Sequence, residues 1–259
     1  MTETTVLVCV AGLASIGILI DSAERVSVRP EVERAFDWRI LASCHTTSSG
    51  GLAPVWTLIG GSETGRASAL WHGSRSVLAL SVVACYLAGW RVPAALLSVL
   101  VLLIQVGVQA RLSLGLDGAD QMQVVIWLGL ALSGLSAAAG LFLIAVESLL
   151  SYFIAGLAKL TGPDWRSGAA PAQIVSTIGH GSPEAHRLLA VVGVPIAFAT
   201  MGFEIVGPVL ALFGEILAAG FIASAIGFHA GVAWAMGLNN FVWAFCAALP
   251  AVWWLVSSF

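Results

Sequence analysis

Continuous apolar stretches, each about as long as a membrane-crossing helix, dominate this chain of 259 residues. A helix needs about 20 predominantly apolar residues to cross the hydrocarbon core of a bilayer. Because the stretches do not alternate with polar residues, a membrane β-barrel is not expected. The pattern predicts an all-α fold, a polytopic transmembrane helical bundle of about eight membrane segments. Clear spans are expected at 73–90, 92–110, 121–140, 142–160, 188–207, 208–228 and 230–257.

The composition excludes a soluble globular domain. Hydrophobic residues make up 59% of the chain and charged residues 10%, and the mean hydropathy is +0.96, whereas soluble domains carry about 25% charged residues. We therefore expect an integral membrane protein whose first partner is the lipid bilayer. The net charge of −3 gives no reason to expect a nucleic-acid partner. No CxxC spacing, and hence no zinc site or disulfide framework, is found among Cys9, Cys44, Cys85 and Cys246.

The N-terminal quarter differs from the rest of the chain. Residues 1–69 are expected to form a membrane segment followed by a polar, interfacial region, and residues 70–259 the main transmembrane bundle. The first apolar segment, 6–20, is short for a span. It is preceded by Glu3 and by no basic residue, so we interpret it as a retained membrane segment rather than a signal peptide. Residues 21–39 contain four arginines and five acids, which is typical of a solvated or interfacial helix.

Three short motifs predict where helices begin or break. Trp90-Arg91-Val92-Pro93 is a turn that places proline near the start of a helix. Ser182-Pro183-Glu184 combines a capping residue, a first-turn proline and an acid. Gly207-Pro208 predicts a break or kink between the expected spans 188–207 and 208–228, because proline has no N–H to donate inside a helix.

Lys159 is the only lysine in the chain, and it stands at the end of an apolar run. An ammonium group in a membrane is costly unless it is paired, neutralised or able to reach the interface. A low-dielectric environment disfavours the charged form of an amine, so a buried lysine is a candidate base. The alternative is an interfacial anchor at a helix end. The residue alone leaves both roles open.

Few other ionisable side chains are expected inside the membrane. Glu147 is twelve residues before Lys159 and is rotated well away from it on the same helix, so Glu204, from another helix, is the better partner. Tyr152, seven residues before the lysine, shares its face. For Glu215 we expect a structural hydrogen bond between helices. For Glu204 and His229, a structural tie and a functional role both remain open. The candidates besides Lys159 are Glu147, Glu204, Glu215 and His229.

No metal site is expected. The spacing of His180, Glu184 and His186 fits no standard zinc pattern, and Glu184 is already expected to cap a helix start. Cys44-His45 is an equally weak metal motif. His72 is expected to lie at the membrane interface.

Several motifs in the correct order resemble the HTTM domain, the membrane part of vitamin K-dependent gamma-carboxylases. The resemblance covers about residues 70–257 and also extends, in size and spacing, to small stand-alone bacterial HTTM proteins. The chain departs from the carboxylases at Ala158, where they have the first of two lysines, and in a turn to Trp165 that is about one residue longer. The matching motifs are Gly73-Ser74-Arg75, Gly118-Ala119-Asp120-Gln121, Tyr152-Phe153-Ile154-Ala155-Gly156, Lys159-Leu160, Asp164-Trp165, Gly168, Phe203-Glu204, Pro208, Phe228-His229, Gly237 and Phe241.

The resemblance implies a chemistry as well as a fold. In the carboxylases the matching lysine is the base that deprotonates reduced vitamin K, which then reacts with oxygen and drives carboxylation of a glutamate. Carried over, Lys159 would be the catalytic base of a carboxylase-like enzyme in a bacterial cell membrane. A reduced, vitamin K-like quinone would be the cofactor. Substrate or cofactor contacts would come from Tyr152, Trp165, Glu204, His229 and Asp120.

The sequence is also compatible with two other functions. One is a non-catalytic membrane factor for the maturation or export of a secreted peptide, or for immunity to it, whose partner is that peptide or a soluble subunit. The other is a small-solute transporter, which is less favoured because the sequence has no internal repeat.

The orientation depends on residues 40–61, which fit a membrane-dipping segment or an interfacial loop better than a clean span. If they do not cross, every arginine except Arg91 falls on one side, which the positive-inside rule makes cytoplasmic. The resemblance instead places the site on the outer side, which requires 40–61 to cross. Both topologies stay open.

Overall fold

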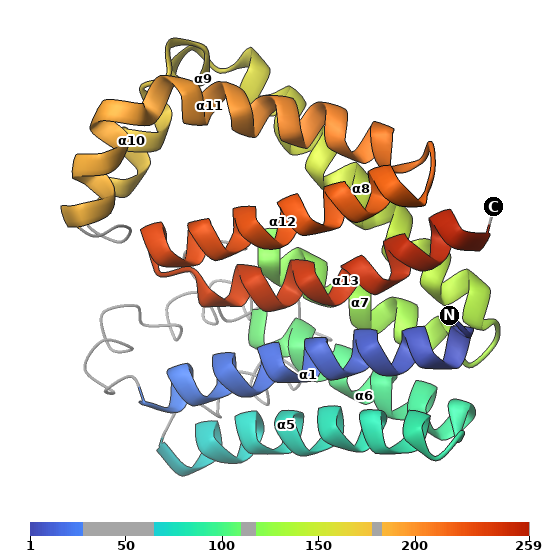
Figure 1. The fold of residues 1–259 in the computed structure, drawn as a ribbon. Helices are drawn as coiled ribbons and strands as arrows, with labels where there is room; N and C mark the ends of the chain where they lie inside the picture. Colours follow the sequence, from blue (N-terminus) through green and yellow to red (C-terminus); the bar gives the residue numbers. More distant parts are fainter. Residues whose placement is uncertain (28–64, 110–117, 178–182, 259) are drawn as a thin grey trace, which may run out of the picture.

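Helices make up nearly all of the computed structural model, which describes residues 1–27, 65–109, 118–177 and 183–258 (Figure 1). These residues contain no strand. In chain order the helices are α1 (Glu3–Ser27), α5 (Gly65–Leu87), α6 (Arg91–Gln109), α7 (Gly118–Leu132), α8 (Ala137–Thr161), α9 (Pro163–Ser167), α10 (Ala170–Val175), α11 (Pro183–Ala211), α12 (Glu215–Met236) and α13 (Asn239–Ser258).

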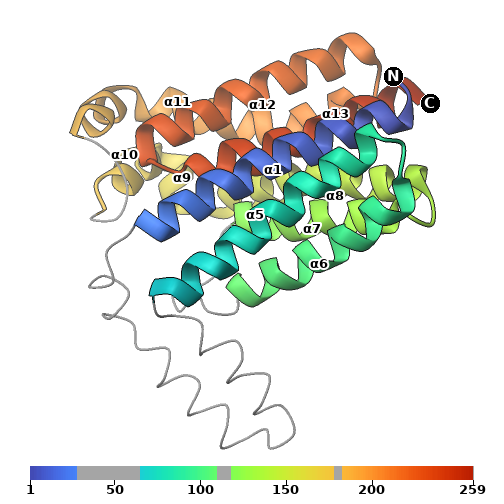
Figure 2. The ribbon, with the colours of Figure 1, turned by 90° about the horizontal axis from the view of Figure 1, so that it is seen from below.

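The long helices pack side by side into one bundle (Figures 1 and 2). α1 packs against α5 and α13, so the first and last helices are neighbours and the two chain ends lie close together. α5, α6, α7 and α8 pack in sequence order, and α8 continues the contact chain to α11 and α13. Short α9 and α10 pack on α11, at the end of α8. The helices α8, α11, α12 and α13 thus enclose a region of their own.

Six described helices are long and apolar enough to cross a membrane, namely α1, α6, α8, α11, α12 and α13. This confirms the predicted all-α, membrane-spanning class. α5 and α7 are outside the set; α7 has only 15 residues. The predicted number of about eight segments therefore remains a prediction.

Two predicted boundaries are wrong. The span expected at 121–140 is interrupted: α7 ends at Leu132, and α8 begins at Ala137 after Ser136, whose hydroxyl accepts a hydrogen bond from the N–H of Ala139 at 3.2 Å. The break expected at Gly207-Pro208 is absent, because Pro208 lies inside α11. The chain turns only after Ala211, where Gly214 has a φ of +138° that other residues rarely adopt.

The first apolar segment is longer than expected. α1 has 25 residues, and its membrane-competent part covers Glu3–Glu24, not only 6–20. The helix can continue through Asp21 and Ser22 because both polar side chains bond to Arg75 of α5. The expectations for 40–61, Cys44-His45, His180 and most of 21–39 fall outside the described residues.

Other expected boundaries are confirmed. α5 ends at Leu87 and α6 begins at Arg91, with Gly89 at a φ of +75° in the turn between them. α11 begins at Pro183, as the proline and acid at that position predicted. Between α8 and α11 the chain forms the short helices α9 and α10.

Candidate functional site

A cavity of about 1090 Å³ lies among α8, α11, α12 and α13, with edges on α7, α9 and α10. Its wall is mostly apolar, so the few polar side chains that reach it stand out. Those on α7, α8, α11 and α12 are Gln121, Glu147, Ser151, Tyr152, Lys159, Thr200, Glu204, Ser224 and His229.

Lys159 and Glu204 form an ion pair on the wall of this cavity. Nζ of Lys159 donates a hydrogen bond of 2.8 Å to Oε1 of Glu204 and is 2.7 Å from Oε2. The second contact is a close charge contact without hydrogen-bond geometry, so Oε2 has no hydrogen-bond donor in the described part of the chain. The glutamate side chain is 4% exposed and the lysine side chain 21%, so the amine is the more accessible partner.

Close packing of α8 on α11 brings the two residues together. Gly156 lies one turn before Lys159, and a Cβ added to it would come within 2.6 Å of Ile205 Cγ1 and 2.9 Å of Glu204 Cβ. Only glycine permits this approach, because any side chain there would push the helices apart. Glu147 also lines the cavity; its backbone carbonyl accepts a hydrogen bond of 2.7 Å from Ser151 Oγ, but its carboxylate makes no hydrogen bond or ion pair with other described residues.

The end of α8 places an aromatic ring beside the amine. The N–H of Gly162 donates to the carbonyl of Lys159, and Pro163 then opens the short helix α9. This turn puts the Trp165 ring centroid 5.2 Å from Nζ of Lys159, within the range of a cation–π contact. Lys159 is therefore held on two sides, by a carboxylate and by an indole.

Tyr152 and His229 form a second polar pair in the same cavity. The Tyr152 hydroxyl is 2.7 Å from Nε2 of His229, which links α8 to α12. The His229 side chain is buried, and its Nδ1 has no hydrogen-bond partner among the described residues. A buried polar atom left without a partner is uncommon, so a bound group or water is expected to contact it.

Aromatic rings surround this second pair. His229 stacks on Phe245 with centroids 4.4 Å apart and an interplanar angle of 17°. Tyr152 meets Phe203 and Phe221 edge-on, at 5.6 and 5.2 Å. These flat apolar walls suit a planar, apolar ring. The sequence motifs drew attention to Phe203 and Phe241 but not to Phe221 and Phe245.

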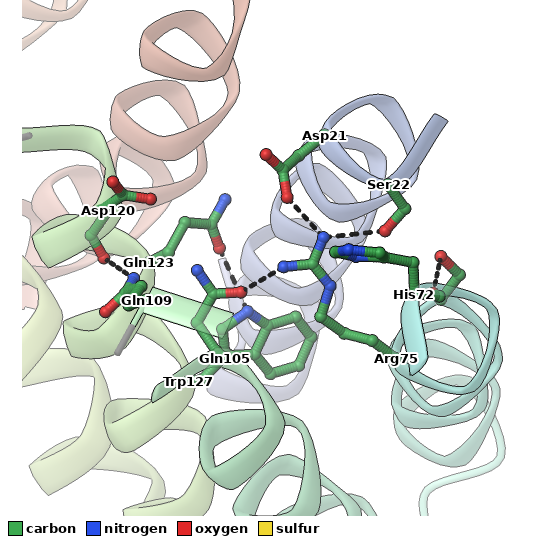
Figure 3. Close-up of polar contacts among 10 residues, drawn as sticks. Asp21, Ser22, His72, Arg75, Gln105, Gln109, Asp120, Gln123 and Trp127 are labelled. Carbon is green, nitrogen blue, oxygen red and sulfur yellow. Dashed lines mark hydrogen bonds and ion pairs between the residues drawn. The ribbon is translucent and has the colours of Figure 1, made fainter. Parts of the chain in front are cut away.

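A separate polar cluster lies outside the cavity, between α1, α5 and α6 (Figure 3). Arg75, which is 1% exposed, forms an ion pair with Asp21 and donates hydrogen bonds to Ser22 Oγ at 2.8 Å and Gln105 Oε1 at 2.7 Å. His72 is buried beside it on α5, and its position at the membrane interface stays a prediction.

Asp120 belongs to the same polar region rather than to the cavity wall. Its backbone carbonyl accepts a hydrogen bond of 2.7 Å from Nε2 of Gln109, and its neighbours Gly118 and Gln121, but not Asp120 itself, line the cavity.

The structure brings most of the predicted site residues together. Five of the six line one cavity, and the expected partnership of Lys159 with Glu204 rather than Glu147 is present. Glu215, expected to tie helices, is instead exposed at the first turn of α12. The five are Tyr152, Lys159, Trp165, Glu204 and His229.

Within the described residues, no group of three or more histidine, cysteine, aspartate or glutamate side chains is placed to hold a metal ion. Fold and site define a polytopic helical membrane protein with a lysine–glutamate ion pair on the wall of a large, mainly apolar cavity. Comparison of the chain with protein-family models, with curated proteins and with solved structures gives no match.

Proposed function

We propose that this protein is an HTTM-type membrane enzyme in which Lys159 is a general base acting on a lipid quinol. The observation that carries the proposal is the Lys159–Glu204 pair in an otherwise apolar cavity, with a 2.8 Å hydrogen bond between the two groups. Ionisable groups inside a membrane are costly and mark functional sites by default. Coupling of the quinol chemistry to modification of a peptide or a lipophilic substrate, in a bacterial cell membrane, belongs to the same proposal.

The hydrogen bond gives Lys159 a route to the neutral form that a base requires. If the proton moves from Nζ to Glu204, the ion pair becomes an amine and a carboxylic acid, with no change in total charge. In a low-dielectric site the neutral pair avoids the cost of burying two charges. The amine can then accept the proton of a weakly acidic hydroxyl, because it is the more exposed member of the pair.

The residues present fit a quinone ring. Trp165 lies beside Lys159, and Phe245 stacks on His229, so planar apolar groups flank both polar pairs. Two buried polar atoms on the wall, Glu204 Oε2 and His229 Nδ1, have no hydrogen-bond partner among the described residues. A reduced quinone would supply two weakly acidic hydroxyl groups and, with dioxygen as the oxidant, the reducing equivalents for its own conversion to epoxide and water.

The alternative is a non-catalytic factor for maturation or export of a secreted peptide, or for immunity to it. The observation that favours it is the same ion pair, because interhelical polar contacts of this kind also serve only to tie helices together. Under this alternative the pair matters for folding and for partner binding, and the protein changes no quinone.

One experiment distinguishes the enzyme from the non-catalytic factor. Purified protein in liposomes is given a reduced 2-methyl-1,4-naphthoquinone with a prenyl tail and dioxygen, and quinol loss and epoxide formation are followed for the wild type, Lys159→Ala and Arg187→Ala. Arg187 is the control, since it forms an exposed ion pair on α11 away from the cavity. We expect turnover in the wild type and the control and its loss in Lys159→Ala. Equal turnover in a folded Lys159→Ala protein would refute the base assignment, and copurification of a peptide without turnover would favour the alternative.

A further inference from the structure

A strip of small residues on α12 lies along the cavity, beside larger lining side chains of the same helix such as Phe228, His229 and Trp234. Ser224, Gly227, Gly231 and Ala235 recur at helical spacing on one face and line the cavity. A Cβ added to Gly227 or to Gly231 would meet no atom within 4 Å. We call these four residues the glycine face of α12. The face extends along about three turns of a membrane helix, about 16 Å at 1.5 Å per residue, and open space is found at its two glycines.

The opening of the cavity beside this face is apolar. Five large apolar lining residues remain strongly exposed, so the cavity is not closed off: Leu150 at 42%, Ile154 at 55%, Leu188 at 49%, Ile196 at 42% and Trp234 at 59%. α11 and α12 are also the least buried of the six membrane-competent helices, with 28% and 22% of their apolar windows buried. Ile196 and Trp234 lie on these two helices, so the exposed wall that α11 and α12 contribute is apolar and is expected to face lipid rather than water.

The shape of α11 provides the space. α11 and α12 meet near the turn that joins them, where Phe203 and Phe221 stack at 5.6 Å. Beyond that contact α11 bows away from α12, and the cavity lies in the widening gap (Figure 1). Pro195 interrupts the hydrogen-bond ladder of α11 in this stretch, which is the usual cause of such a bend.

We propose that the glycine face of α12 binds the apolar tail of a membrane amphiphile, which reaches the cavity from the bilayer between α11 and α12. The polar head of the amphiphile lies at Lys159 and Glu204. The inference rests on the proposed function for the identity of the head group, a quinol ring, and adds the position of the tail.

Volume and polarity support this occupant. Pockets for small ligands measure about 300–1,000 Å³, and a cavity of about 1090 Å³ is larger than one ring requires. Its polar groups are few, and two of its buried polar atoms, on Glu204 and His229, have no hydrogen-bond partner in the described residues. A ligand with a compact polar head and a long apolar remainder matches both features.

A second copy of the chain is the competing occupant, because Gly227 and Gly231 also form a small-xxx-small motif that can pair membrane helices. The cavity argues for the tail, because the glycine face and two residues of α11, Ile196 and Thr200, line the same space. A substitution at Gly220 distinguishes tail binding from pairing with a second copy. Gly220 lies on the same face and is equally free of neighbours within 4 Å, but it does not line the cavity.

The test measures binding of two probes, 2-methyl-1,4-naphthoquinone without a tail and the same ring with a four-prenyl tail. Quenching of tryptophan fluorescence gives the dissociation constants for the wild type, Gly231→Leu, Gly231→Ala and Gly220→Leu in detergent micelles. We expect Gly231→Leu to weaken binding of the tailed probe about tenfold, because each excluded methylene loses its burial, while binding of the bare ring changes less than about twofold. Gly231→Ala is expected to be intermediate, and Gly220→Leu to behave as wild type.

Three outcomes would overturn the inference. Equal effects of Gly231→Leu on both probes, or no effect on either, would place the tail elsewhere. Loss of a dimer in Gly220→Leu and Gly231→Leu alike, with tail binding retained, would assign the face to a second copy. If the wild type binds neither probe, the proposed function is refuted together with this inference. If it binds the ring but the tail does not change the affinity, only this inference is refuted.

Discussion

Nζ of Lys159 lies 2.8 Å from Oε1 of Glu204, and this contact joins α8 to α11 across 45 residues of sequence. The two partners are not equally buried, because the glutamate side chain is 4% exposed and the lysine side chain 21%. Lysine can also extend its flexible chain toward an interface, which glutamate cannot do as readily. Loss of the lysine therefore leaves a buried charge unpaired, whereas loss of the glutamate leaves a charge that can reach solvent.

Removing the lysine should destabilise the protein more than removing the glutamate. Lys159→Met leaves a buried carboxylate without its cation, which costs about 3–5 kcal/mol for a fully buried pair and somewhat less here. Glu204→Gln leaves an amine that can still reach solvent, so we expect about 1–2 kcal/mol. The free energy of unfolding in mixed detergent–SDS micelles measures both.

A double-mutant cycle gives the control for this prediction. The coupling between Lys159 and Glu204 should exceed about 1 kcal/mol, whereas the Arg187–Glu184 pair on α11 should couple by less than about 0.5 kcal/mol. The control side chains are 74% and 65% exposed at an N···O distance of 3.1 Å. Equal coupling in the two pairs would mean that the cavity does not strengthen the ion pair.

Gly156→Ala should disturb both stability and the site. The added Cβ would lie 2.6 Å from Ile205 Cγ1 and 3.0 Å from the Ile205 backbone nitrogen, which cannot move without α11. We expect a loss of about 1–3 kcal/mol and a fall in quinol turnover as Glu204 moves away from Lys159. Gly202→Ala on α11 is the matched control, because its Cβ would meet nothing within 4 Å. Similar unfolding free energies for the two variants would contradict the close-packing argument.

Tyr152→Phe should cost little stability. The variant removes the hydroxyl that lies 2.7 Å from Nε2 and leaves both ring nitrogens of His229 without a partner among the described residues. Interhelical hydrogen bonds in membrane proteins average about 0.6 kcal/mol, so we expect a loss of that size. In His229→Phe the same Tyr152→Phe change should cost less, since no ring nitrogen remains to be left unpaired. A cycle that shows no coupling would mean that the contact does not stabilise the fold.

Helical spacing predicted the site better than it predicted the boundaries. Counting residues along α8 separated Glu147 from Lys159 and pointed to Glu204, because a helix fixes the direction of its side chains. Hydropathy could not place the turn between α7 and α8, since the chain is apolar on both sides of Ser136. Pro208 was expected to break α11, but neighbouring helices can accommodate a proline inside a membrane helix.

Local sequence patterns could not predict contacts between segments that are far apart in the sequence. The pairing of Asp21 with Arg75 extends α1 past its apolar segment, and no spacing rule connects those two positions. The aromatic wall formed by Phe221 and Phe245 likewise depends on how α12 and α13 cross α8.

Arg75 should be essential for stability but not for ligand binding. Arg75→Leu leaves Asp21 without its buried partner, for which we expect a loss of about 3–5 kcal/mol. Arg75→Lys keeps the charge but cannot reproduce the bonds from two guanidinium nitrogens to Asp21, Ser22 and Gln105, so it should lose about 1–3 kcal/mol. None of these residues lines the cavity, so the folded fraction of either variant should bind 2-methyl-1,4-naphthoquinone within about twofold of the wild-type affinity. Unfolding in mixed micelles and fluorescence quenching measure the two quantities on the same samples. A folded Arg75→Lys protein that no longer binds the ring would mean that the cluster between α1, α5 and α6 controls the shape of the cavity.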